Sequence, residues 1–212
     1  MKKWVFLLVM MSLSISAFAQ NIALKSNILY DATTTINLGV EFALTDKLTL
    51  DVSANYNPWT FRQTSMALDG TKQTLDGKFR HLMVQPELRW WLCEKFNGHF
   101  FGVHAHYANY NVGGLDFLPD GFGEYKDKTT GQYVDGIQNK RFQGWLAGGG
   151  VSYGYHLLLS SRFSLEFTLG VGYAYLAYDK YDCADCGTKL SSSTMHYLGP
   201  TKAGITAIFM IQ

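Results

Sequence analysis

The sequence predicts an all-β fold, an eight-stranded antiparallel transmembrane β-barrel of the outer-membrane type that follows a cleaved signal peptide. Three observations lead to this prediction. Apolar and polar residues alternate in many segments, and the connections between these segments are alternately short and long. Aromatic residues mark the ends of the alternating segments. The composition agrees, because 15% of the residues are aromatic and 21 glycines accompany only 4 prolines, as suits antiparallel sheets and barrels.

The N-terminal segment has the three parts of a secretory signal peptide. Two lysines precede an apolar run at 4–13, and Ala17-Phe18-Ala19 forms an A-x-A cleavage site. The apolar run is too short for a transmembrane helix. We therefore expect residues 1–19 to be removed and residues 20–212 to form one barrel domain.

The segment from Leu48 to Pro58 has the clearest strand pattern. One face carries Leu48, Leu50, Val52, Ala54 and Tyr56, and the other carries Thr49, Asp51, Ser53, Asn55 and Asn57. Strand side chains alternate with period two, so one face is apolar and the other polar. The same pattern predicts seven further strands, at 22–30, 35–44, 78–92, 99–112, 143–158, 163–177 and 196–211.

The connections between these strands differ in length. Short turns are predicted at 45–47, 93–98 and 160–162. Long loops are predicted at 60–77, 113–140 and 179–195. Short periplasmic turns and long external loops are typical of outer-membrane barrels, and an even number of strands lets the first and last strands pair.

The two faces of the strands indicate which one meets lipid. Aromatic residues end the apolar face, as in the girdles of membrane barrels: Tyr56, Trp59, Trp90, Tyr107, Trp145, Tyr173 and Tyr175. The opposite face carries the charges: Lys25, Glu41, Asp51, Glu87, Arg89, Glu166 and Lys202. A soluble barrel would turn these charges to water. In a membrane barrel they form a charge network inside the lumen, and we expect Gly148 to Gly150 to make room there for long side chains such as Arg89.

Two segments also resemble a known family. QPELRWWL at 85–92, followed by GHFFGVHAHYANYNV at 98–112, is similar to the signature of the domain-of-unknown-function 3575 family. Its members are outer-membrane barrels allied to the OmpA/OmpX-type eight-stranded proteins. The resemblance extends over essentially the whole mature chain. It implies a barrel in the bacterial outer membrane, and it implies no particular activity.

A CxxC motif lies in the last long loop, at Cys183 and Cys186. Redox chemistry would require a βαβ context, and a zinc site would require a second pair of ligands. A small loop disulfide suits an exported protein better. We therefore expect Cys183 and Cys186 to pair and Cys93 to stay unpaired.

Four histidines, His81, His104, His106 and His156, raise the question of metal binding. Polar side chains facing the lumen are the default inside such barrels, so we expect no metal and no cofactor. Catalysis would need His104 or His106 beside Glu87 and a hydroxyl group. Arg89 follows Glu87 on the same face and engages its carboxylate, so we expect no catalytic residue.

The charge and the barrel size restrict the function. A net charge of +1 without a basic stripe excludes nucleic acid as a partner, and the interior of eight strands is just wide enough for side chains to fill. We therefore expect a non-enzymatic protein with a filled lumen, embedded in outer-membrane lipid. Its role is structural, or it contacts surface or envelope proteins through the external loops. The alternatives are a lipid-modifying hydrolase and a narrow gated channel.

Overall fold

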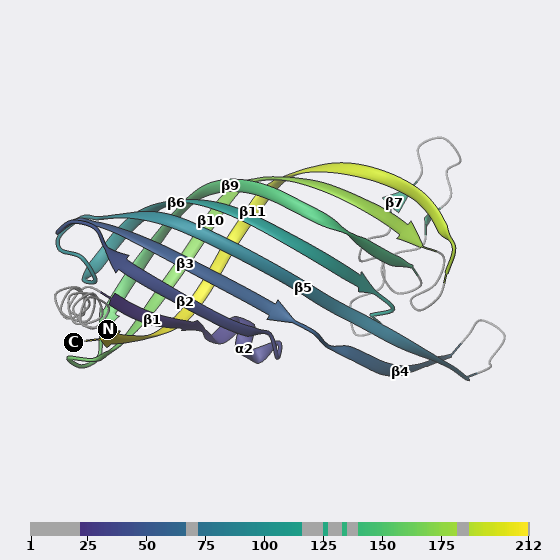
Figure 1. Ribbon diagram of the computed structural model, residues 1–212, viewed down its shortest axis with the longest axis horizontal. Coiled ribbons are helices and arrows are strands. Elements are labelled where there is room, and N and C mark those ends of the chain that lie inside the picture. The colour runs from purple at the N-terminus through teal and green to yellow at the C-terminus, as the bar shows by residue number, and fades with distance from the viewer. Residues whose placement is uncertain are drawn as a thin grey trace, which may run out of the picture.

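The computed structural model describes residues 22–66, 72–115, 125–126, 133–134, 140–181 and 187–211. Eight antiparallel strands in these ranges close into a barrel (Figure 1). The strands are β1 (Ile22–Asn27), β2 (Ile36–Ala43), β3 (Leu48–Asn57), β5 (Lys72–Trp91), β6 (Gly98–Gly113), β9 (Arg141–Leu158), β10 (Phe163–Tyr181) and β11 (Lys189–Ile211). The predicted fold class is confirmed.

Two strand pairings complete the ring of strands and define its register. The first strand pairs with the last, from Ile22 opposite Ile211 to Asn27 opposite Thr206. Strand β3 pairs with β5 from Leu48 opposite Trp90. Both chain ends therefore lie at one end of the barrel, together with the short turns after β2, β5 and β9 (Figure 1).

Four short elements complete the described chain. They are α2 (Ile28–Ala32), β4 (Thr60–Met66), β7 (Tyr125–Lys126) and β8 (Tyr133–Val134). Strand β4 continues the direction of β3 and forms a hairpin with β5, while β7 and β8 pair only with each other. No described helix has both the length and the apolar character needed to cross a membrane.

The structure corrects the predicted first strand. We expected a strand over 22–30, but the strand ends at Asn27 and the chain turns into α2. The Asn27 side chain accepts a hydrogen bond from the Leu29 amide at 3.1 Å and so caps the helix. A single helical turn is too short to leave a helical period in the sequence.

The strands on the side opposite the chain ends are longer than predicted. The expected loop at 60–77 is wrong, because β4 pairs with β5 from Thr60 opposite Lys78 to Met66 opposite Lys72. Part of the expected loop at 179–195 is strand as well, since β10 runs to Tyr181 and β11 begins at Lys189. Strand pairing continues beyond the apolar band, where an alternating apolar face is not required.

The two faces of the wall differ as predicted. Leucine, valine and aromatic side chains point outward and are exposed, whereas the residues between them are buried in the interior. Phe163 lies 5.2 Å from Phe209 at the end with the termini. At the other end, Trp145 packs 6.3 Å from Tyr107 and 5.7 Å from Tyr175, as measured between ring centroids. An apolar band between two aromatic girdles is the lipid-facing surface of a membrane barrel.

The height of the wall is uneven around the barrel. Strands β1 and β2 have 6 and 8 residues, whereas β5 has 20 and β11 has 23. In Figure 1 the β1–β2 hairpin ends at α2, while the green and yellow strands continue well beyond it. Above the apolar band, Lys189 and Ser192 hydrogen-bond Asp179 and hold the pKa of that carboxyl below its usual value.

Candidate functional site: the charged layer of the lumen

Aromatic side chains close the lumen at the end with the chain termini. Trp91, Phe96 and Phe100 are buried and form one cluster with Ala23 and Ile208. The Trp91 ring lies 4.8 Å from Phe100 and 6.0 Å from Phe96. Phe96 comes from the β5–β6 turn, so this turn folds inward beneath the barrel.

Arg89 is the centre of the charged layer above this floor. Its Nε lies 2.6 Å from Glu87 Oε2, and its Nη2 lies 2.8 Å from Asp51 Oδ2. Its Nη1 lies 2.9 Å from both Glu41 Oε2 and Glu166 Oε2. The guanidinium group is also 4.5 Å from the centre of the Phe100 ring. One side chain that is 1% exposed therefore joins four strands and the aromatic floor.

Two lysines complete the charged layer, Lys25 on the short strand β1 and Lys202 on the long strand β11. Lys25 Nζ lies 2.7 Å from Glu41 and 2.9 Å from Glu166. Lys202 Nζ lies 2.8 Å from Glu87 and 3.8 Å from Asp51. The structure thus brings all seven charged residues singled out in the sequence into one network, in which four carboxylates meet three cations.

Hydroxyl groups satisfy further oxygen atoms of the network. Thr49 donates to Glu41 Oε1 at 2.5 Å and accepts from the Trp91 indole at 2.9 Å, so it links the charges to the aromatic floor. Thr168 donates to Glu166 at 3.0 Å, and Ser152 donates to Glu87. Buried charges are tolerated where partners of this kind occupy their remaining hydrogen-bonding positions.

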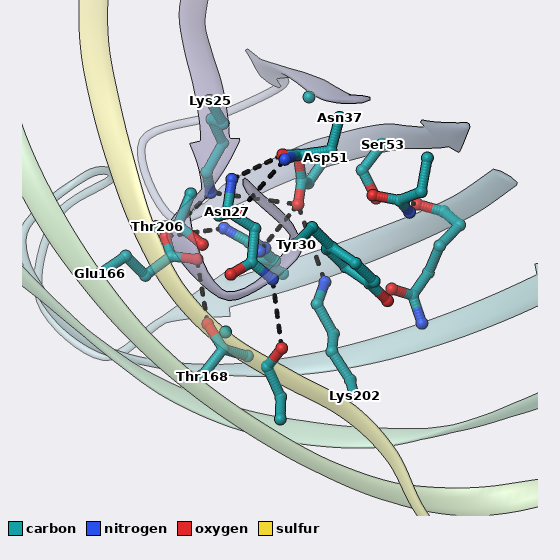
Figure 2. Close-up of a pocket in the computed structure, with 16 residues that line it drawn as sticks. Lys25, Asn27, Tyr30, Asn37, Asp51, Ser53, Glu166, Thr168, Lys202 and Thr206 are labelled. Carbon is teal, nitrogen blue, oxygen red and sulfur yellow. Dashed lines mark hydrogen bonds and ion pairs between the residues drawn. The ribbon is translucent and has the colours of Figure 1, made fainter. Parts of the chain in front are cut away.

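A small cavity of about 40 Å³ lies beside the network (Figure 2). Asp51 Oδ1, Asn55 Nδ2 and Gln85 Nε2 are buried there without a hydrogen-bond partner among the described residues. Unpaired donors and an unpaired acceptor suit ordered water, for which such a volume suffices. The cavity at this level therefore has room for ordered water.

The histidines lie at different levels of the lumen. His104 Nε2 is 2.9 Å from Thr201 Oγ1, and His104 Nδ1 is 3.9 Å from Glu87 Oε1. The His106 ring lies 5.8 Å from His104. His156 lies deeper, 5.6 Å from Trp91, and half-buried His81 lies next to Phe79. In the parts of the chain that the structure describes, no three His, Cys, Asp or Glu side chains are grouped so as to hold a metal ion.

Comparison with known proteins assigns the chain to a family. Residues 4–211 match the model of a family described as a protein of unknown function, DUF3575. The chain belongs to this family. The NMR solution structure of the E. coli outer membrane protein W is similar with a TM-score of 0.33 and 13% sequence identity, over 82% of this chain and 79% of that one. A search of curated proteins finds no match.

The glycines of β9 have a different neighbour from the one expected. A Cβ at Gly148 would lie 2.1 Å from the Tyr173 carbonyl oxygen, and one at Gly150 would lie 2.3 Å from the Val171 carbonyl oxygen. Gly148 and Gly150 therefore permit close approach of β10, and Gly148 also makes room for His106, whose Nε2 would lie 2.7 Å from a Cβ there. Neither glycine makes room for Arg89. Gly154 makes that room indirectly, because a Cβ there would collide with the Phe100 ring on which Arg89 lies.

One of the three cysteines, Cys93, lies among the residues that the structure describes. Cys183 and Cys186 lie outside the described residues, as does the signal peptide at 1–19. Cys93 is exposed in the turn after β5 and forms no disulfide within the described chain.

Several residues that are buried on the lumen side were not singled out in the sequence. Trp91, Phe100, Thr49, Ser152 and Thr168 all share the inward face with the charged residues. Their position in the strand alternation was the available signal. An inward tryptophan or phenylalanine stands out less than a charge, because aromatic residues also occur on the lipid-facing side of the same strands.

Proposed function

We propose that this protein is a non-enzymatic barrel of the bacterial outer membrane whose lumen is filled and whose role is structural or in surface interaction. The observation that carries the proposal is the Arg89 network, which joins side chains of β2, β3, β5 and β10 across the interior. Its partners are outer-membrane lipid and surface or envelope proteins, which it contacts through the connections after β4, β6 and β10. Recognition commonly resides in loops that a rigid scaffold holds.

The network also weighs against a narrow gated channel. A conducting path would have to separate Arg89 from four carboxylates that are within 2.9 Å of it. Removing one partner from a buried ion pair costs about 3–5 kcal/mol. The aromatic floor at Trp91 and Phe100 would also have to move, because it lies directly beneath these charges.

One observation favours a second candidate, a lipid-modifying hydrolase. Thr201, His104 and Glu87 follow each other as hydroxyl, imidazole and carboxylate, the order of groups in a catalytic triad. The 3.9 Å between His104 and Glu87 exceeds a hydrogen bond. Glu87 is held instead by Arg89, Lys202 and Ser152, so its carboxylate is not free to orient the histidine. We therefore favour the non-enzymatic function.

Two experiments on the full-length protein test the proposal. Cell fractionation should place the mature chain in the outer membrane, and a soluble periplasmic location would refute that part. The purified barrel should then be incubated in vesicles with lipid A and phospholipids, and the products followed by mass spectrometry. We expect no turnover. Turnover that is lost in both His104→Ala and Thr201→Ala, while Cys93→Ala retains it, would establish the hydrolase instead.

A further inference from the structure

The barrel wall is incomplete beside β11. Strand β1 accompanies β11 only from Ile211 to Thr206, whereas the outward apolar band of β11 continues to Leu198, which is 83% exposed. A strand that spans the membrane needs about 9–11 residues, more than β1 or β2 provides. Within the described chain, the free edge of β11 between 198 and 205 therefore has no strand partner at the depth of the bilayer.

Local features protect this free edge. Pro200 has no amide hydrogen to leave unpaired, and it lies at a register shift where Val171 pairs with Pro200 and Gly170 with Lys202. Asn27 Nδ2 donates to the Ala203 carbonyl at 3.2 Å, and α2 packs against β11. Unpaired backbone polar groups that face lipid cost free energy. These features are therefore expected where the edge of a strand faces the bilayer without a partner strand.

A cavity of about 350 Å³ lies at this opening, between α2, β5 and β11. Leu29, Phe79 and Pro200 form an apolar part of its lining, and Tyr30, His81 and Lys202 form a polar part. Tyr30 and Lys202 also line the small lumen cavity (Figure 2). The volume is at the lower end of the range for small-molecule sites.

The charge of the lining selects the kind of ligand. Lys202 contributes a cation and His81 a second nitrogen-bearing side chain, and no carboxylate is among the described residues that line this cavity. Lys202 lines both this cavity and the smaller lumen cavity. Its Nζ lies 2.8 Å from Glu87 Oε2, and its side chain is 12% exposed. An anionic group is therefore favoured at the inner end, and an apolar chain is favoured at Leu29, which is 44% exposed.

We propose that this cavity binds a membrane-dissolved amphiphile with one acyl chain and a carboxylate or phosphate head. The head lies near Lys202 and His81, and the chain passes Leu29 into the bilayer. A single chain fits the volume, and entry through the wall leaves the four contacts of Arg89 with its carboxylates in place. The proposal goes beyond the filled-lumen function and requires no catalysis.

Calorimetric titration of dodecyl phosphate and dodecanoate into the full-length barrel in phosphatidylcholine nanodiscs tests the proposal, with empty nanodiscs as the reference. We expect saturable binding of both anions at one site, and no such binding of dodecanol or of inorganic phosphate. Equal binding of dodecanol would show that the head is not recognised. Equal binding of inorganic phosphate would show an anion site without a chain. Either result overturns the proposal.

Two neighbouring residues of α2 give a matched pair of variants. Ile28 and Leu29 are both 44% exposed, but only Leu29 lines the cavity. Leu29→Glu places a negative charge at the mouth of the cavity, where it repels the anionic ligand. It should weaken dodecyl phosphate binding at least about tenfold, whereas Ile28→Glu should not. Equal weakening in both variants would contradict the site. If Leu29→Glu fails to fold, as judged by the heat-dependent shift on gels, Leu29→Trp and Ile28→Trp provide the same comparison by filling space.

Discussion

The charged layer of the lumen and the β1–α2–β2 segment of the wall differ in how their polar groups are satisfied. Each must remove polar groups from contact with lipid. In the lumen, side chains of six strands pair with one another, and their wall is complete. At β1–α2–β2 the wall is too short, and the exposed backbone is protected by a helix cap, a proline and an Asn27 contact.

This difference shows where the barrel is rigid and where it can admit a ligand. The lumen network is dense, since each carboxylate contacts at least one cation within 2.9 Å. The wall segment depends on few hydrogen bonds and has a cavity behind it. Local opening is expected where buried contacts are few. We therefore expect large losses of stability from changes in the lumen and small ones from changes at α2.

The largest effect should come from Arg89→Met. The variant leaves four buried carboxylates with two lysines, and the free energy of unfolding should fall by about 3–5 kcal/mol. Urea unfolding in lipid vesicles, followed by tryptophan fluorescence, measures the loss. Arg162→Met in an exposed turn is the matched control and should change little. Equal stability of the two variants would mean that the network does not hold the barrel together.

A double substitution sharpens this test. Glu87→Gln removes one of the carboxylates that Arg89 neutralises. Added to Arg89→Met, it should therefore cost less than the two single losses together, because residues in contact are not additive. Strict additivity in the same unfolding assay would indicate that Arg89 and Glu87 act independently.

Leu169→Arg should produce the next largest effect. Leu169 points outward, is 62% exposed and lies between the two girdles. Arginine on the lipid face near the bilayer midplane costs about 2–4 kcal/mol. Ser53→Arg is the comparison, because Ser53 lines the polar lumen cavity and crowding is the main penalty there. If vesicle-folding assays show that both positions tolerate arginine equally, the assignment of the two faces is wrong.

The smallest effect should come from Asn27→Ala in the short wall. The variant removes the cap of α2 and the contact with Ala203. The loss of an N-cap costs about 0.5–2 kcal/mol. Hydrogen exchange should show faster exchange at the β1–α2–β2 segment and unchanged exchange around Arg89. Asn97→Ala, in an exposed turn, is the control. Uniformly faster exchange throughout the barrel would contradict the view that the two regions are separate.

Strand alternation was enough to predict the fold and the seven charged residues of the network. Period two assigns Glu87 and Arg89 to one face and Leu88 and Trp90 to the other, because the bilayer requires a strict separation of the faces. Above the bilayer the two faces of a strand need not differ in this way, which explains why the sequence pattern did not predict β4. The α2 turn and the opening beside β11 depend on contacts between Asn27 and residues far along the chain, and no local pattern records such contacts.

The proposal that the lumen is closed is tested most directly by ion flux through the purified barrel in vesicles, with folding checked by the heat-dependent gel shift. We predict that wild-type vesicles hold an ion gradient as long as protein-free vesicles do. This expectation rests on the aromatic floor and the Arg89 layer, which both lie across the proposed path. Rapid loss of the gradient through correctly folded wild-type protein would contradict the account and would establish a channel.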